Sequence, residues 1–74
     1  MIIINGDKLR KYRKEEGYSQ QELGKLLEVD ASAISKYESG EREPRPKVRE
    51  KIVILFGQDA ATDIFLNANW LYVI

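Results

Sequence analysis

The sequence contains no cysteine and no histidine among its 74 residues. Without cysteine the chain has no disulfide framework and no thiolate metal site, and without histidine it lacks the commonest general base and the commonest zinc ligand. No apolar run approaches the roughly 18 residues that a membrane span requires, and no N-terminal stretch joins basic residues to a long apolar segment. These absences exclude zinc fingers and disulfide scaffolds. They predict a cytoplasmic protein without a metal or a cofactor.

A net charge of either sign is also lacking, because 12 basic and 12 acidic residues cancel. A neutral total at first argues against a polyanionic partner. All Lys and Arg residues, however, lie between Lys8 and Lys51, so residues 1–56 carry 12 positive and 10 negative charges and the remaining residues carry two negative charges. Because local faces decide binding, this distribution is compatible with a nucleic-acid partner.

The length bounds the architecture. A chain of 74 residues allows one domain, which we assign to residues 1–74, and folding of such a chain buries only about 60% of its unfolded surface. Stability is then marginal unless something else contributes, and a second subunit often does.

The stretch from Ser19 to Gly40 predicts two short helices joined by a tight turn. Ser19 and Glu22 have the spacing of a capping box, so a helix should begin at Gln20. The apolar stripe of this helix has the spacing i, i+3, i+4 and consists of Leu23, Leu26 and Leu27. We expect the helix to end near Leu27.

A second helix follows the turn, which we assign to Glu28 and Val29. Asp30 is a good N-cap, and Gly40 suits the left-handed position that ends a helix. The buried face of this helix should consist of Ile34 and Tyr37. Two helices with so short a link are typical of a helix-turn-helix.

The outer face of the second helix is predicted to be small, rich in hydrogen-bond donors and singly charged. Gly24 costs about 1 kcal/mol relative to Ala inside the first helix, so we attribute it to close helix approach. The residues left outside on the second helix are Ala31, Ser32, Ala33, Ser35, Lys36 and Ser39. A helix of about nine residues is roughly 13 Å long and fits the DNA major groove, about 12 Å wide, if its face has no bulky acid. The residues that meet this condition are Ala31, Ser32, Ser35 and Lys36.

The sequence resembles the Cro/repressor, or Xre-type, family of helix-turn-helix DNA-binding regulators. The similarity covers roughly Leu9 to Phe65. It includes a basic first helix, the opening Ser-Gln-x-Glu-Leu, a small residue at 24, Val29 in the turn, Ile34, and the ending Tyr-Glu-Ser-Gly-Glu-Arg-Glu-Pro. One departure is Glu28, where the family usually has Gly. This departure matters because a non-Gly residue in a left-handed turn is strained. We expect a cost in stability and no loss of the fold.

The resemblance implies which residues contact DNA. Ala31, Ser32 and Lys36 occupy base-reading positions, with Lys36 suited to guanine and Ala31 to a thymine methyl group. The phosphate-binding positions lie at a helix N-terminus, at the end of the second helix and in the segment after it; they are Ser19, Gln20, Ser39, Arg42 and Arg45. The alternative is ordinary capping at Ser19 and Gln20, and a solvated loop in which Glu41 and Glu43 neutralise the two Arg side chains.

The family also pairs an Arg of its first helix with a Glu of its recognition helix. This resemblance implies a partly buried ion pair between Arg13 and Glu38, which would fasten those two helices together.

The rest of the chain predicts three more helices. Asp7 should cap a helix from Lys8 to about Glu16. Pro46 suits the first turn of a helix from Lys47 to about Phe56. Asp59 should cap a fifth helix, to which we assign Ala60, Ala61, Ile64, Phe65 and Leu66. The predicted fold class is therefore an all-α bundle of five short helices.

Both termini carry β-branched or aromatic runs. Met1–Ile4 predicts a brief strand, and Trp70–Ile74 prefers a strand that needs a covering partner. The partner within the chain is Ile2–Ile4, which would give a two-stranded antiparallel pair, and the partner outside it is a second copy. We predict that dimerisation involves Ile54, Trp70, Leu71 and Tyr72.

These features indicate a homodimeric, sequence-specific regulator of transcription that binds double-stranded DNA, most simply a repressor, with no membrane or small-molecule partner. A protein-interaction module, such as an antitoxin-like or adaptor partner, is the alternative and could coexist with DNA binding. An enzyme is disfavoured because no paired acids stand out and no Gly-rich phosphate loop is present. A steep salt dependence of duplex binding would separate the regulator from the module.

Overall fold

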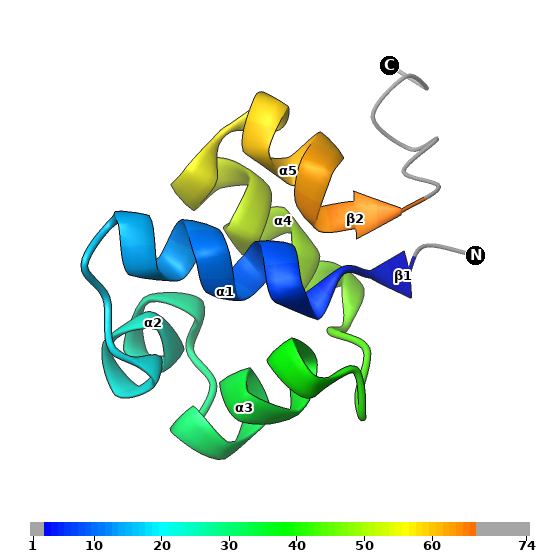
Figure 1. The fold of residues 1–74 in the computed structure, drawn as a ribbon. Helices are drawn as coiled ribbons and strands as arrows, with labels where there is room; N and C mark the ends of the chain where they lie inside the picture. Colours follow the sequence, from blue (N-terminus) through cyan, green and yellow to red (C-terminus); the bar gives the residue numbers. More distant parts are fainter. Residues whose placement is uncertain (1–2, 67–74) are drawn as a thin grey trace.

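The computed structural model describes residues 3–66. Within that range the chain forms five helices and two short strands (Figure 1). In chain order these are β1 (Ile3–Ile4), α1 (Gly6–Glu15), α2 (Gln20–Leu27), α3 (Ala31–Ser39), α4 (Pro46–Phe56), α5 (Gln58–Ile64) and β2 (Phe65–Leu66). No helix in residues 3–66 is long and apolar enough to cross a membrane. The predicted all-α bundle of five short helices is confirmed.

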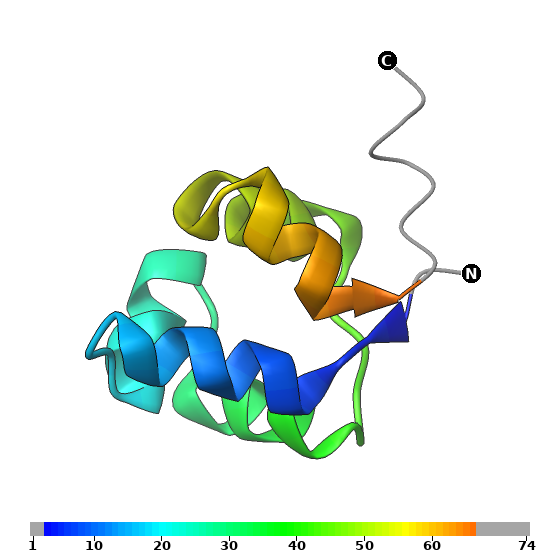
Figure 2. The same cartoon turned by 45° about the horizontal axis from the view of Figure 1, so that its top comes forward.

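Helix α1 packs against α3 and α5, while α2 packs against α3 and also contacts α4. Figures 1 and 2 show α3 on one side of α1 and α5 on the other. The centre of the bundle is apolar, and the side chains with no exposed surface there include Leu9, Leu23, Ile34, Ile52 and Ile64. Each such side chain contributes about 1.5–3 kcal/mol through burial. The core thus joins all five helices and leaves the far side of α3 free.

The start of α1 differs from the prediction. Asn5, rather than Asp7, is the N-cap, and its Oδ1 accepts a hydrogen bond from the Lys8 backbone N–H at 3.2 Å. The helix therefore begins at Gly6, and Asp7 lies in its first turn. A Cβ atom at residue 6 would overlap the Glu38 carbonyl group at the end of α3. Glycine at this position allows α1 to start directly against α3.

The end of the fifth helix also differs from the prediction. Ile3–Ile4 pairs in antiparallel fashion with Phe65–Leu66, with Ile3 opposite Leu66 and Ile4 opposite Phe65. Helix α5 ends at Ile64, and Phe65 adopts an extended conformation. The assignment of Phe65 and Leu66 to the fifth helix is therefore wrong. The partner predicted for Ile2–Ile4, the segment Trp70–Ile74, is not among the described residues, so that pairing stays a prediction. Residues 67–74, including Trp70, Leu71 and Tyr72, lie outside the described residues.

Helices α4 and α5 begin without side-chain caps. Pro46 is the first residue of α4, one residue earlier than predicted, since its ring fixes the helical φ and its missing N–H would have no partner there. Gly57, rather than Asp59, precedes α5, and Asp59 lies in the first turn. The negative charge of Asp59 near the positive end of the helix dipole stabilises α5, although the Asp59 side chain does not cap the helix.

Candidate DNA interface

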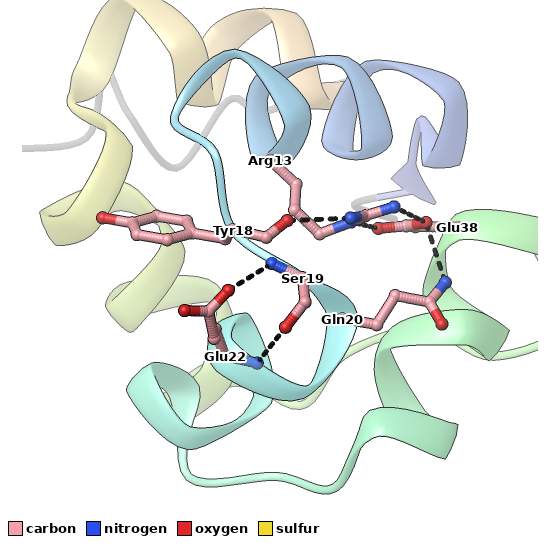
Figure 3. Close-up of polar contacts among 6 residues, drawn as sticks. All are labelled: Arg13, Tyr18, Ser19, Gln20, Glu22 and Glu38. Atoms are coloured by element: carbon pink, nitrogen blue, oxygen red, sulfur yellow. Dashed lines mark hydrogen bonds and ion pairs between the residues drawn. The ribbon is translucent and has the colours of Figure 1, made fainter.

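Helix α2 begins with the predicted capping box. The Ser19 hydroxyl oxygen accepts a hydrogen bond from the Glu22 N–H at 3.0 Å, and the Glu22 carboxylate accepts one from the Ser19 N–H at 2.8 Å (Figure 3). The hydrogen bond from the Ser19 backbone, followed by that from its side chain, lowers the pKa of Glu22 below its ordinary value. The Ser19 backbone N–H would have to exchange its bond to Glu22 before it could bind a phosphate, whereas the hydroxyl oxygen acts in the cap as an acceptor.

The turn between α2 and α3 packs closely against Gly24 of α2. A Cβ atom at Gly24 would lie 2.7 Å from the Val29 carbonyl oxygen, so only glycine fits without movement. Glu28 has φ 61° and ψ 41°, the left-handed conformation expected from the departure at this position. Its carboxylate forms an ion pair with Lys51 of α4, which offsets part of the strain. The turn therefore sets the angle at which α3 leaves α2.

Helix α3 has the predicted bounds and caps. Asp30 accepts a hydrogen bond from the Ala33 N–H at 2.7 Å, and Gly40 ends the helix at φ 80°. Ile34 and Tyr37 are buried, as predicted, but so is Ala33, which the prediction places on the outer face. Ala33 directly precedes Ile34 and is four residues from Tyr37, so all three side chains fall on one side of the helix.

The outer face of α3 carries the remaining small polar side chains and one cation. Ser32, Ser35, Lys36 and Ser39 are exposed, and Ala31 is half-buried. The Ser39 hydroxyl donates to the Lys36 carbonyl oxygen at 3.1 Å. A hydroxyl has one proton, so Ser39 must give up this bond before it can donate to a phosphate.

Behind this face, Arg13 and Glu38 form the ion pair that the resemblance implies. Arg13 Nε lies 2.6 Å from Glu38 Oε2, and the two side chains are only 9% and 5% exposed (Figure 3). Arg13 Nη2 also donates to Glu38 Oε1 at 3.2 Å, and Arg13 Nη1 donates to the Tyr18 carbonyl oxygen at 2.9 Å. The pair fastens α1 to α3. Through the bond to the Tyr18 carbonyl oxygen, Arg13 also holds the residue that directly precedes Ser19.

Gln20 joins the same cluster, which the sequence does not reveal. Its Nε2 donates to Glu38 Oε1 at 3.2 Å. Figure 3 shows the Gln20 side chain extending from the start of α2 toward Glu38. An amide nitrogen has two protons, so one N–H of Gln20 is still available for the phosphate contact expected of it. The Glu38 carboxylate thereby fixes where that second N–H lies.

The loop between α3 and α4 carries the other two predicted phosphate-binding residues, Arg42 and Arg45, both of which are exposed. The Arg42 guanidinium carbon lies 6.0 Å from the centre of the Tyr37 ring, a cation–π contact. The Glu41 and Arg42 N–H groups donate to the Lys36 carbonyl oxygen at 3.0 and 3.4 Å. These contacts keep Arg42 next to the end of α3.

The residues predicted for dimerisation are only partly placed by the structure. Ile54 projects from α4 and is 82% exposed. Trp70, Leu71 and Tyr72 lie outside the described residues. An apolar side chain this exposed is compatible with an interface, but it does not by itself define one.

A capped helix, a left-handed turn and a second helix with a free polar face together define a helix-turn-helix domain. The sequence profile of the helix-turn-helix family matches residues 9–61, most of the chain. The chain therefore belongs to the Cro/repressor, or Xre-type, branch of the helix-turn-helix family.

The chain is also similar to part of several longer archaeal proteins. It is 38% identical over 64 residues to an HTH-type transcriptional regulatory protein of Pyrobaculum aerophilum, covering 86% of this chain and 26% of that protein. It is 39% identical over 67 residues to proteins of the same description in Saccharolobus islandicus and Saccharolobus solfataricus, covering 90% of this chain and 22% of each. The chain thus spans about a quarter of the length of the curated relatives that it matches.

Proposed function

We propose that this domain binds double-stranded DNA sequence-specifically and regulates transcription, with α3 as the recognition helix in the major groove. The observation that carries the proposal is the composition of the outer face of α3. This face consists of the exposed residues Ser32, Ser35, Lys36 and Ser39, so it offers hydroxyl groups and one ammonium group to DNA. The descriptions of the archaeal relatives as transcriptional regulatory proteins support it further.

The dimensions support groove binding. Nine residues at about 1.5 Å per residue give a helix roughly 13 Å long, which matches a major groove about 12 Å wide. Small side chains at Ala31, Ser32 and Ser35 let the backbone approach the bases, and Lys36 is long enough to reach guanine O6 and N7. We assign base reading to these four residues.

The cations beside α3 suit phosphate contacts. Arg42 and Arg45 follow α3 directly and are exposed. Gln20 lies at the N-terminus of α2, where free backbone N–H groups and the positive end of the helix dipole favour an anion. We assign phosphate binding to these residues, with Ser19 and Ser39 in secondary roles because the Ser19 backbone N–H and the Ser39 hydroxyl proton are already donated within the domain.

The proposed assembly is a homodimer that represses transcription. Two recognition helices about 34 Å apart can read successive major grooves on one face of DNA, and each copy has one. Ile54, which is 82% exposed, and the residues Trp70, Leu71 and Tyr72 are the proposed contacts.

Selection from randomised duplex DNA tests the function. We expect enrichment of a two-fold symmetric site, bound with an affinity that falls steeply as salt rises because phosphate contacts release counterions. Ser35→Glu should abolish binding, because it places an acid in the groove. Gln58→Glu adds the same charge at the exposed start of α5 and should bind nearly as well as the wild type. No enrichment, or equal effects of the two variants, would contradict the proposal.

A further inference from the structure

Strand β1 connects the terminal strand pair to the loop that carries the candidate phosphate-binding residues. On one edge of β1, the Asn5 N–H donates to the Ile64 carbonyl oxygen at 2.6 Å. The Ile4 N–H points to the opposite edge, because successive N–H groups of a strand alternate in direction. It donates to the Glu43 carboxylate at 2.7 Å, across 39 residues of sequence. Figures 1 and 2 both show this loop running beside β1.

Several contacts hold the loop between α3 and α4 against the rest of the domain, and among the hydrogen bonds given for it the Glu43 bond is the shortest. Arg42 lies over the Tyr37 ring at 6.0 Å, and the Pro44 carbonyl oxygen accepts a bond from Arg49 Nη1 at 3.4 Å. A charge-assisted bond of 2.7 Å is stronger than either of these contacts. Glu43 therefore provides the strongest polar restraint on the segment between Arg42 and Arg45, in addition to the burial of Pro44.

The direction of the Glu43 side chain matters because of its charge. An acid between Arg42 and Arg45 would repel a DNA backbone if it faced the same way as the guanidinium groups. Its carboxylate instead contacts the backbone of Ile4, a residue that is only 5% exposed. The Ile4 N–H has little access to water, so removal of its acceptor leaves an unsatisfied donor. Both partners thus favour the arrangement that directs the carboxylate toward β1.

We propose that Glu43 is a positioning residue for DNA binding: through its hydrogen bond to Ile4 it holds the loop in the conformation that presents Arg42 and Arg45 to phosphates. This inference rests on the proposed function. It differs from the view of Glu43 as a surface acid that merely neutralises its neighbours. The two views predict opposite effects of removing the side chain.

Three variants separate hydrogen bonding from charge. Glu43→Gln removes the charge but keeps an oxygen that can accept from Ile4. Glu43→Ala removes both. Glu41→Ala removes a charge two residues away; among the bonds of residues 3–66, none involves the Glu41 side chain. Affinity for a selected duplex and a scrambled duplex, measured at several salt concentrations, gives the comparison.

We expect Glu43→Gln and Glu41→Ala to bind both duplexes at least as tightly as the wild type, because each removes a negative charge. Glu43→Ala should bind about fivefold to thirtyfold more weakly than Glu43→Gln. This factor corresponds to the entropy cost of ordering the backbone of one loop residue when DNA binds. Its slope of log affinity against log salt should also fall, by about 0.9 for each phosphate that the variant no longer neutralises. Exchange of the Ile4 amide hydrogen should accelerate in Glu43→Ala and stay slow in Glu43→Gln.

Equal binding by all three variants would overturn the inference, because charge alone would then account for Glu43. If Glu43→Ala fails to fold, Glu43→Asp decides instead: it keeps the charge but is one methylene shorter, so it should weaken binding, and wild-type affinity would refute the positioning role. Failure of the wild type to bind any duplex would contradict the proposed function itself, a result distinct from equality among the variants.

Discussion

Removing one charge of the Arg13–Glu38 pair should destabilise the domain more than removing both. Arg13→Met deletes three hydrogen bonds. Within residues 3–66 it leaves the Glu38 carboxylate, 5% exposed, with the Gln20 amide as its remaining hydrogen-bond partner. An uncompensated buried charge costs about 3–5 kcal/mol. Glu38→Gln should lie at the lower end of this range, because its amide oxygen can still accept from Arg13.

These costs are large relative to the whole stability. At about 0.05–0.15 kcal/mol per residue, a domain of 74 residues is stable by about 4–11 kcal/mol. Either single variant should therefore lower the urea midpoint strongly. The double variant Arg13→Met/Glu38→Gln leaves no buried charge and should cost less than either single change.

Urea unfolding followed by far-ultraviolet circular dichroism measures all four proteins at one pH. Sucrose can be added equally to every sample if a single variant unfolds in buffer. Lys8→Met is the matched control, since it breaks an exposed ion pair with Asp63 at 3.8 Å that is worth about 0–1 kcal/mol. A double variant that is less stable than both single variants would refute the reasoning.

Three further substitutions test local features. Glu28→Gly should stabilise the domain by about 1 kcal/mol, because relief of left-handed strain exceeds the loss of the exposed ion pair with Lys51. Glu28→Ala loses the ion pair and keeps the strain, so it should destabilise the domain in the same urea titration. The hydrogen bonds from Ser19 lower the pKa of Glu22, so stability that is present above its unfolded pKa is lost as the pH falls from about 5 through the lowered value; Glu22→Gln should flatten this part of a stability curve, and an unchanged curve would contradict the link. Ile54→Lys changes a side chain that is 82% exposed, so it should keep the helical circular dichroism of the folded subunit but convert a dimer to a monomer in sedimentation and lower the melting temperature, because the dimer no longer stabilises the fold. An unchanged dimer mass would place the interface elsewhere.

Local sequence patterns predict the helix-turn-helix closely because each signal acts within one helical turn. The capping box at Ser19 and the stop at Gly40 depend on backbone groups three or four residues away, and both are found where predicted. The left-handed conformation of Glu28 follows instead from the resemblance, because the family usually has Gly at this position. Such signals are short-range and strong, so the bounds of α2 and α3 agree with the prediction.

Where two local signals compete, the prediction fails. Asn5-Gly6 is a turn signal, yet Asn is also a strong N-cap, and the close approach of Gly6 to α3 selects the cap. The apolar residues after Asp63 suit a helix or a strand equally well. Pairing with Ile3–Ile4 decides for a strand at Phe65, and no local pattern contains that information.

Long-range polar contacts cannot be predicted from this sequence by spacing. Gln20 and Glu38 are 18 residues apart, and Ile4 and Glu43 are 39 apart. In the sequence, Glu43 is simply one acid between two cations, which indicates a neutralised loop. The direction of its carboxylate toward β1 depends on how the strand and the loop pack, so the structure is needed to see it.

The sharpest test of the proposed interface compares Lys36 with Arg42. Lys36 is exposed on the outer face of α3, where its ammonium group can reach base edges, whereas Arg42 lies beyond Gly40 and over Tyr37, beside the end of the helix. Lys36→Ala should cost about 1–3 kcal/mol on the selected duplex, relax the preference at one or two base pairs, and change binding to a scrambled duplex little.

Arg42→Ala should act differently, because a phosphate contact is made on every sequence. It should weaken both duplexes alike and reduce the slope of log affinity against log salt by about 1 per subunit. Titrating both variants against both duplexes at several salt concentrations separates the two roles, and Lys14→Ala on the exposed face of α1 serves as a control for the loss of one positive charge. Should Lys36→Ala lower affinity equally for both duplexes, Lys36 binds phosphate, and sequence reading must rest on Ala31, Ser32 and Ser35 alone.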